Sequence, residues 1–315
     1  MEHGWERTLP IIKIDDNTIK KLFRSIENPE DISQISLLDE GCRTTNYLVN
    51  TISNKKYVLK LFFQEEQNYR KELMLFNKLK DHVPIQKICL VGRNSIDGRP
   101  YIIYEYAEGK TISQHLKNGR KIDKKLIKSV AHNIGKIHNN KFKKMGSLNE
   151  NLDVRNDFIS IVSLYDKYIN DNVIKRLGND NIEKIKSIVN RNIQVLKSLD
   201  YDSRLIHGDF QGTNIVILNN RVSGIIDWEF CMSGCPLMDI GQFFRYEEYF
   251  DEELINEFKY EYERISDYPL IDEWYKMSRI LDLISLIQLM GRDEDMPNKY
   301  TKIKSIVECT IKKFY

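Results

Sequence analysis

Three oxygen-bearing side chains late in the chain have the spacing that metal-assisted phosphoryl transfer requires. The stretch LIHGDFQGTNIVI, residues 205–217, places Asp209 in a tight loop and Asn214 five residues later, where a strand is predicted to begin. Asp227 ends the paired strand in GIIDWEF, residues 224–230. A carboxylate, an amide and a second carboxylate can therefore meet at one end of a hairpin. Asn214 and Asp227 supply the hard oxygens that Mg²⁺ prefers, which leaves Asp209 to orient a hydroxyl nucleophile and accept its proton.

The elements that must position these side chains fall into two regions of different character. Before Gly109 the pattern predicts mostly strands and one main helix, at residues 64–80, where apolar side chains recur at helical spacing. The strands are expected in ISLLDEG, TNYLVNTI, KYVLKLFF, KICLVG and RPYIIYEYA. After Gly109, helical patterns at 123–140, 155–171 and 181–199 precede a hairpin that turns at Asn219-Asn220, and helices then resume to Tyr315. The pattern predicts an α+β fold with domains at residues 1–107 and 108–315.

Composition excludes several classes of protein. The 315 residues have a mean hydropathy of −0.48 and no long uncharged apolar run, so we expect no membrane association. The N-terminal MEHGWERTLP lacks the apolar segment of a secretory signal, and the five cysteines are an odd number that is widely spread, which favours a reducing, cytoplasmic location. The net charge of +2 gives no overall basic field for nucleic acid.

Charge is nevertheless uneven along the chain. Residues 110–146 contain eleven Lys or Arg and one acid, whereas residues 229–275 contain thirteen acids and three Lys or Arg. Each stretch fits a solvated helix surface, and the acidic one alternatively fits a concave face that concentrates a polycationic small molecule. The basic stretch has no interleaved aromatic side chains, so it does not resemble a nucleic-acid site.

The run HGDFQGTN resembles the catalytic loop of the aminoglycoside phosphotransferase family and its relatives, the choline, methylthioribose and homoserine kinases, and IIDWE resembles their metal-binding segment. The resemblance implies a protein-kinase-like bilobal fold, with a small β-rich N-lobe and a large, mostly helical C-lobe. It implies that Asp209 is the catalytic residue, that Asn214 and Asp227 hold Mg²⁺, and that ATP or GTP is the co-substrate.

The resemblance also assigns a nucleotide-binding lysine. Lys60 in YVLK corresponds to the lysine that holds nucleotide phosphates, and strand alternation places it on the same face as Val58 and Phe62. Its expected partner is Glu72, and Glu65 and Glu66 are rivals for that role.

Two further segments would contact the nucleotide. The loop DEGCRTTN, residues 39–46, resembles the one that covers the phosphates, and the segment YEYAEG, residues 104–109, resembles the connector that binds the purine. In the connector, main-chain atoms of Glu105 and Ala107 would bond the base edge. The bulk of Tyr104 would disfavour adenine, so the choice between ATP and GTP as co-substrate stays open. The loop residues expected to contribute are Gly41, Cys42, Arg43 and Thr44.

Other matched residues are expected to be structural. By resemblance, His207 holds the catalytic loop, His138 belongs to the scaffold, and Asp239 caps and anchors a helix. Gly208 stands where protein kinases carry an arginine that reads a phosphorylated activation loop. Only twelve steps separate Asp227 from Asp239, too few for such a loop, so we expect constitutive activity.

The acceptor is the most open part of the prediction. The acidic stretch favours an aminoglycoside-like polycation and hence antibiotic resistance, bound in part by Glu229, Glu247, Glu248 and Asp251. Choline, a sugar or homoserine on the same fold is an alternative, and so is a nucleotide-binding module without catalysis. The expected partners are a small-molecule substrate, with no nucleic acid and no membrane, and the expected state is a monomer or weak dimer.

Overall fold

The chain divides into two compact units. The computed structural model describes residues 5–38, 43–63, 68–94 and 98–315. The β-rich unit contains Glu6–Glu108 and Glu150–Leu152, and the helical unit contains Gly109–Asn149 and Asp153–Tyr315 together with Trp5.

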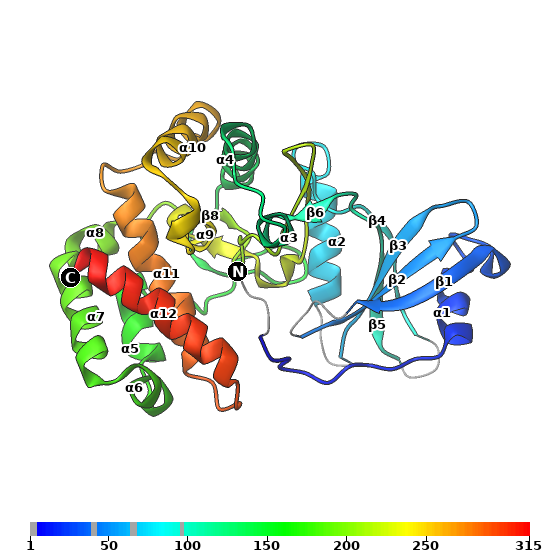
Figure 1. The fold of residues 1–315 in the computed structure, drawn as a ribbon, viewed down its shortest axis with the longest axis horizontal. Coiled ribbons are helices and arrows are strands. Elements are labelled where there is room, and N and C mark those ends of the chain that lie inside the picture. The colour runs from blue at the N-terminus through cyan, green and yellow to red at the C-terminus, as the bar shows by residue number, and fades with distance from the viewer. Residues whose placement is uncertain (1–4, 39–42, 64–67, 95–97) are drawn as a thin grey trace. The chain divides into compact units, whose positions relative to one another are not determined.

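The β-rich unit is built on one antiparallel sheet with the strand order β1-β2-β3-β5-β4 (Figure 1). The hairpin between β2 and β3 turns at Asn54, whose φ of 61° is one that asparagine tolerates better than most residues. The strands are β1 (Ile32–Leu38), β2 (Thr45–Thr51), β3 (Lys56–Leu61), β4 (Ile88–Arg93) and β5 (Pro100–Glu105).

Strand alternation gives this sheet two apolar faces. One face packs Tyr47, Val49 and Leu59 against α1 (Asp16–Phe23). On the other face Phe62 and Tyr104 pack with Tyr69 of α2 (Asn68–Leu79). The helix predicted at 64–80 is thus present from Asn68, and residues 64–67 lie outside the described part of the chain.

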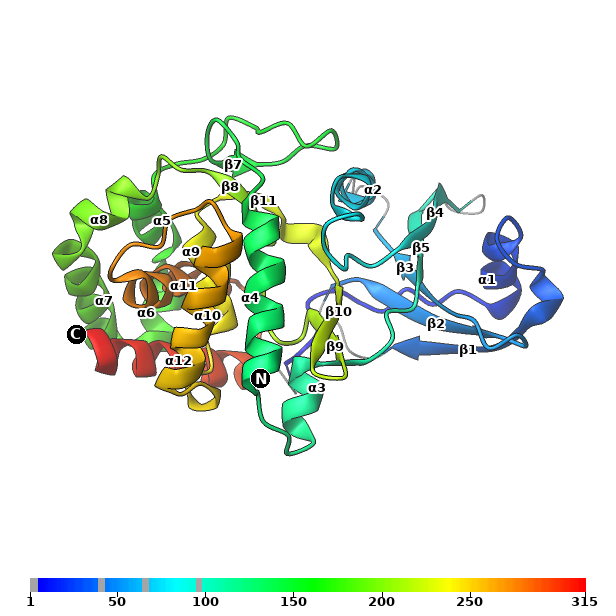
Figure 2. The ribbon, with the colours of Figure 1, turned by 90° about the horizontal axis from the view of Figure 1, so that it is seen from above.

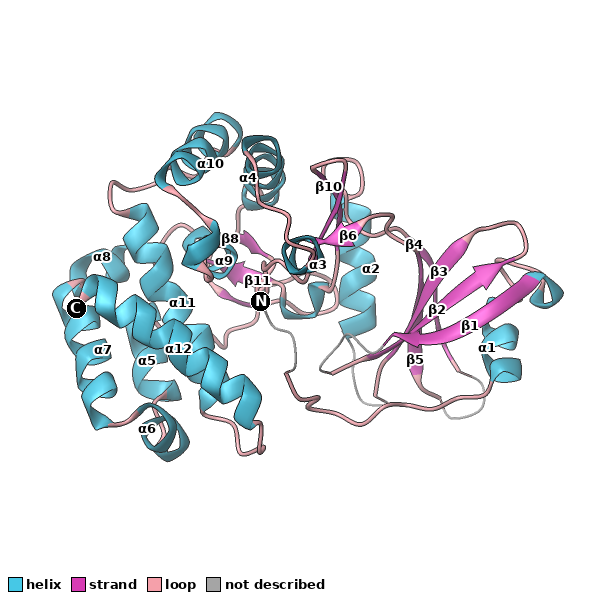
Figure 3. Cartoon of the chain, viewed as in Figure 1, coloured by secondary structure: helices cyan, strands magenta, loops and turns pink. Residues whose placement is uncertain are grey.

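The helical unit combines many helices with two small antiparallel sheets (Figure 3). One sheet has the order β10-β9-β6, and the other has the order β7-β11-β8. Their strands are β6 (Lys110–Thr111), β7 (Gly146–Ser147), β8 (Arg204–Ile206), β9 (Ile215–Leu218), β10 (Arg221–Ile225) and β11 (Met232–Gly234). The turn between β9 and β10 is at Asn219-Asn220, both with positive φ, as the sequence predicted.

Side-chain caps fix where several helices of this unit begin, for example Asp123 before α4 and Asp251 before α10. No helix in the described ranges is both long and apolar enough to cross a membrane. The helices are α3 (Ile112–Lys117), α4 (Lys124–His138), α5 (Ile161–Tyr168), α6 (Asp171–Leu177), α7 (Asn179–Arg191), α8 (Ile193–Ser198), α9 (Pro236–Phe243), α10 (Glu252–Ile265), α11 (Trp274–Met290) and α12 (Pro297–Phe314).

Two helix predictions were wrong in their extent. The pattern at 155–171 is helical only from Ile161, because Ser160 caps α5 there, and Asn170 already caps the next helix. The pattern at 181–199 is interrupted at Asn192, whose side-chain amide donates to the carbonyl of Ile188 at 2.7 Å. A polar side chain that bonds local backbone competes with helix continuation, and apolar periodicity alone does not reveal it.

Candidate active site

Helix α9 holds the loop that follows β8 (residues 207–214) through two side chains. The Asp239 carboxylate accepts the backbone N–H groups of His207 at 2.7 Å and Gly208 at 2.9 Å. One turn later, Gln242 accepts from the Phe210 N–H at 2.8 Å and donates to the Gly208 carbonyl at 3.0 Å. Asp239 and Gln242 are both buried, so these bonds form away from water and hold the loop backbone firmly.

Asp239 therefore does not cap its helix, contrary to the sequence-based expectation. Helix α9 starts at Pro236, and Cys235 at the N-cap position makes no side-chain cap bond. Asp239 lies within the first turn of α9. Its carboxylate instead accepts hydrogen bonds from the loop and lies 3.3 Å from His138 Nε2. Burial lowers the pKa of His138 against the opposing effect of Asp239.

Glycine is required at position 208. Its φ is +79°, and a Cβ built there would lie 2.3 Å from the carbonyl oxygen of Phe230. No side chain fits without moving backbone, so this loop conformation is incompatible with an arginine at that position.

His207 is enclosed by the protein. Its Nε2 lies 3.0 Å from the carbonyl oxygen of Ile226, and its ring centroid lies 4.5 Å from that of Trp228. The residue has no exposed surface, a position that suits a scaffold role.

Two amide side chains fix the Asp209 carboxylate. Asn214 Nδ2 donates to Asp209 Oδ2 at 2.8 Å and to its backbone carbonyl at 2.9 Å. Gln211 Nε2 donates to the other oxygen, Oδ1, at 2.8 Å. Burial raises the pKa of Asp209, and the charge of Asp227 acts in the same direction. The carboxylate is thus held in one orientation by neutral donors.

Asp227 lies two residues after β10 in a left-handed conformation, with φ 62° and ψ 65°. Such values are uncommon outside glycine and concentrate at functional sites. The backbone around it is tied to Asn214, whose carbonyl accepts from the Ile226 N–H at 3.0 Å. The hairpin therefore brings Asn214 and Asp227 to the same end, as the spacing predicted.

The donor chemistry at this end fits Mg²⁺. The Asn214 amide nitrogen is taken by Asp209, which leaves Oδ1 as the acceptor of that side chain, and Asp227 adds a carboxylate. No group of three or more His, Cys, Asp or Glu within the described ranges could hold a metal ion. The protein would therefore offer two oxygens and leave other positions to phosphate and water, which is how Mg²⁺ is commonly bound.

The β-rich unit contains a buried ion pair. Lys60 Nζ on β3 lies 2.9 Å from Glu72 Oε1 on α2, and both side chains are buried. The hydroxyl of Tyr104 on β5 donates to the other oxygen of Glu72. The pair expected from the sequence is therefore present, and the rivals Glu65 and Glu66 lie outside the described residues.

The other nucleotide-binding candidates lie in the connector and in the loop before β2. Glu105 is exposed, pairs with Lys87 at 2.7 Å, and its carbonyl accepts from Gln86 Nε2 at 3.2 Å. Ala107 follows in an irregular segment. In the loop before β2, Thr44 is buried and Arg43 is half-buried, whereas Gly41 and Cys42 lie outside the described residues.

Among the acidic substrate candidates, Glu247 and Asp251 have clear structural roles. Glu247 pairs with Arg279 at 3.1 Å and Lys313 at 2.9 Å, and Asp251 caps α10 by accepting from the Leu254 N–H. The remaining candidates are Glu229, which is buried after β10, and Glu248, which is exposed.

The basic and acidic stretches of the sequence bind each other across two helices. Figure 2 shows α4 and α10 side by side. Lys124 pairs with Glu253 at 2.5 Å and Lys128 with Glu257 at 3.2 Å, and one turn further His132 Nδ1 lies 3.0 Å from Glu261. Glu253, Glu257 and Glu261 thus face the basic helix α4 and do not contribute to an open acidic face.

Sequence reasoning missed Gln211, Gln242 and Arg245. Gln211 lies inside the motif that was recognised, and its polar side chain two residues after Asp209 was the available signal. Gln242 and Arg245 follow Asp239 by one and nearly two helical turns, but nothing local indicates that they face the loop.

Comparison with known proteins places this architecture in a family. The model of the phosphotransferase enzyme family matches residues 34–274. No curated protein sequence matches the chain.

Three similar solved structures show the same fold. A thermostable mutant of aminoglycoside phosphotransferase APH(4)-Ia, in ternary complex with AMP-PNP and hygromycin B, is 14% identical with a TM-score of 0.66, over 94% of this chain and 98% of that one. Choline kinase LicA from Streptococcus pneumoniae is 19% identical with a TM-score of 0.62, over 95% and 100%. ADP-bound aminoglycoside phosphotransferase APH(2'')-Ib is 17% identical with a TM-score of 0.60, over 96% and 99%. These matches confirm the predicted α+β, protein-kinase-like fold class. The chain belongs to the phosphotransferase enzyme family.

Proposed function

We propose that this protein is a small-molecule kinase that transfers the γ-phosphoryl group of a nucleoside triphosphate to a hydroxyl group. The observation that carries the proposal is the Asp209 carboxylate, whose two oxygens accept from the side-chain amides of Gln211 and Asn214. A carboxylate fixed in this way suits the task of orienting a hydroxyl, since its remaining lone pairs point in set directions.

In this proposal Asp209, Asn214 and Asp227 have different roles in phosphoryl transfer. Asp209 aligns the acceptor hydroxyl for in-line attack on the γ-phosphorus and takes its proton as the new P–O bond forms. Asn214 and Asp227 hold Mg²⁺, which when bound neutralises phosphate charge. The leaving nucleoside diphosphate departs with the electron pair of the broken P–O bond.

The β-rich unit is proposed to bind the nucleotide. Lys60, oriented by Glu72, would contact the phosphates, and the backbone around Arg43 and Thr44 would add N–H donors. The Tyr104 hydroxyl donates a hydrogen bond to Glu72, which fixes the Tyr104 ring beside the connector that would bind the base. ATP and GTP are both candidates. The AMP-PNP and ADP complexes of similar enzymes support a nucleotide co-substrate.

The acceptor is proposed to be an aminoglycoside-like polycation, with Glu229 and Glu248 as candidate acidic contacts. The hygromycin B complex of a similar enzyme supports this class, whereas the choline kinase relative favours choline as the second candidate. Carboxylate recognition of ammonium groups predicts that KM for the acceptor rises with added salt. A salt-independent KM would contradict charge recognition.

A turnover panel tests the function. ADP or GDP release is measured with ATP and with GTP against aminoglycosides, choline, homoserine and neutral sugars, with and without Mg²⁺. We expect acceptor-dependent release that requires Mg²⁺. Nucleotide binding without turnover on any acceptor would instead favour a non-catalytic binding module.

The matched control for this panel is Asp209→Asn, which preserves size and removes the proton acceptor. We expect it to fold and to lose at least ~10²-fold in turnover, the low end of what general-base catalysis contributes. Turnover equal to wild type would remove Asp209 from the proposed mechanism.

The remaining expectations concern the setting of the enzyme. We expect a cytoplasmic monomer or weak dimer without affinity for nucleic acid. Sedimentation checks the oligomeric state, and a heparin-binding assay at low salt checks the affinity for nucleic acid. Expression in a sensitive host checks whether the activity confers antibiotic resistance.

A further inference from the structure

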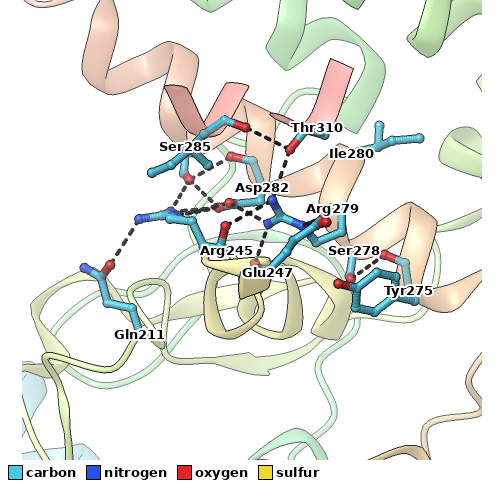
Figure 4. Close-up of polar contacts among 12 residues, drawn as sticks. Gln211, Arg245, Glu247, Tyr275, Ser278, Arg279, Ile280, Asp282, Ser285 and Thr310 are labelled. Atoms are coloured by element: carbon cyan, nitrogen blue, oxygen red, sulfur yellow. Dashed lines mark hydrogen bonds and ion pairs between the residues drawn. The ribbon is translucent and has the colours of Figure 1, made fainter. Parts of the chain in front are cut away.

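A buried cluster of charged side chains contacts Gln211, which belongs to the loop that carries Asp209 (Figure 4). Arg245 follows α9, and its guanidinium donates to both oxygens of Asp282 on α11, at 3.0 and 2.7 Å, and to Ser285 at 2.9 Å. Arg279 donates to Asp282 from the same helix at 3.2 Å. Burial alone would raise the pKa of Asp282, but Arg245 and Arg279 hold it below its ordinary value.

The cluster reaches the loop through Gln211. Arg245 Nη1 donates to Gln211 Oε1 at 3.1 Å, and Gln211 Nε2 donates to Asp209 Oδ1 at 2.8 Å. Both Gln211 and Arg245 are buried. Since a guanidinium has only donors, its contact with Gln211 is satisfied only when the amide oxygen faces Arg245. The amide nitrogen must then face Asp209.

Close helix packing holds Arg245 in place. A Cβ at Gly241 of α9 would lie 2.0 Å from the Ser278 carbonyl oxygen, so glycine is what lets α9 approach α11. In addition, Arg279 donates to the carbonyls of Gly241 at 3.1 Å and Arg245 at 3.2 Å. The backbone from which the Arg245 side chain extends is therefore fixed against α11.

We propose that Arg245 is a positioning residue of the phosphoryl-transfer site, acting by fixing the orientation of the Gln211 amide so that Gln211 donates to Asp209. The inference rests on the proposed function, in which Asp209 accepts the proton of the acceptor hydroxyl. If the amide turned over, its oxygen would meet the carboxylate oxygen, and the two lone pairs would repel. Asp209 would then leave the orientation in which it aligns the hydroxyl.

The first test is Gln211→Leu, which removes the bridge and keeps Arg245 with Asp282. We expect kcat to fall about tenfold or more, as for loss of a hydrogen bond to a charged group, with the KM of nucleotide and acceptor within about twofold of wild type. A wild-type kcat overturns the proposal. The matched control is Asn192→Leu, another buried amide far along the chain, which should leave kcat unchanged.

A double-mutant cycle separates positioning from stability. In the wild-type background, Arg245→Lys should lower kcat about as much as Gln211→Leu, because one ammonium cannot serve Asp282 and Gln211 as the flat guanidinium does. In the Gln211→Leu background the same substitution should have no further effect on kcat. Effects that multiply would mean that Arg245 acts independently of Gln211, and would overturn the proposal.

A measurement that needs no acceptor keeps this proposal separate from the proposed function. The Gln211 side-chain amide resonance in a ¹⁵N spectrum is assigned by its loss in Gln211→Leu. We expect that resonance to be protected from exchange in wild type and to lose protection in Arg245→Lys. Unchanged protection overturns the proposal. Failure of every acceptor to support turnover, with protection lost as expected, would instead count against the proposed function alone.

Discussion

Lys60 in the β-rich unit and Asp209 in the helical unit are both charged groups held by other side chains, but their partners differ. Lys60 is paired directly with a carboxylate, Glu72, at 2.9 Å. Asp209 contacts the neutral amides of Gln211 and Asn214, and Arg245 bonds to Gln211. The charge of Arg245 lowers the pKa of Asp209, but burial outweighs it and the pKa is raised. A lysine that binds phosphate keeps its charge in either state, so a direct partner does it no harm. A carboxylate that must take a proton would be hindered by a cation in contact with it, since the cation favours the ionised form.

The comparison predicts that substitutions at the helical site reduce turnover, whereas those at the Lys60 pair also reduce stability. The largest effect is expected for Asp227→Ala, which removes one of the two protein oxygens proposed for Mg²⁺. We expect turnover to fall by about 10²-fold or more, because metal stabilisation of the transition state is worth several kcal/mol. A Mg²⁺ titration of turnover checks this, with the exposed Asp166→Ala as control. An unchanged titration would show that Asp227 does not hold the ion.

Breaking the buried pair should mainly affect folding. Glu72→Gln removes the carboxylate partner of buried Lys60, and we expect the free energy of unfolding to fall by about 3–5 kcal/mol, as for other broken buried pairs. Urea unfolding measures it. The double variant Lys60→Met/Glu72→Gln should recover part of the loss, since no charge then remains uncompensated. A loss below about 0.5 kcal/mol, typical of surface substitutions, would contradict the comparison.

The third prediction concerns His138, which contacts the loop anchor Asp239. Burial lowers the pKa of His138 below the ordinary 6.5, so the folded state favours the neutral ring. The stability from this group is therefore complete above pH 6.5 and is lost as the pH falls toward the folded-state pKa, with a slope of at most about 1.4 kcal/mol per pH unit. Unfolding free energies at pH 7.5 and pH 5 should differ less in His138→Gln than in wild type. An equal difference would rule out this linkage.

The smallest effect is expected on the helix surface. Lys128→Ala removes one ion pair between α4 and α10, and exposed pairs of this kind contribute about 0.2–1 kcal/mol, less at high salt. Unfolding at two salt concentrations measures it, with exposed Lys143→Ala as control. A loss above about 2 kcal/mol would mean that this pair belongs with the buried ones.

Local patterns in the sequence were enough to predict which candidate residues of neighbouring segments converge. The five-residue step from Asp209 to Asn214 and the hairpin to Asp227 indicated their convergence, and the alternation of β3 placed Lys60 on the face of Phe62. Arg245 could not be predicted, because its bond to Gln211 joins residues 34 positions apart and depends on helix packing.

The acidic stretch also shows that sequence composition does not reveal tertiary contacts, here by suggesting a role that those contacts do not support for every acid. Its composition favoured a substrate-binding face, but whether an acid faces solvent or a neighbouring helix depends on tertiary contacts. Glu253 and Glu257 instead pair with lysines of α4. The helix breaks at Asn170 and Asn192 were missed because they depend on single side-chain bonds.

The ion pairs between α4 and α10 recur at intervals of four residues on both helices. One extra residue inserted in the middle of α4 would rotate every later side chain by about 100° and shift it along the axis by about 1.5 Å. His132 would then turn away from Glu261, and the apolar stripe that follows would leave the interior. Evolution and protein engineering can therefore change the length of this chain most easily outside α4, and alignments of distant relatives should show gaps there least often.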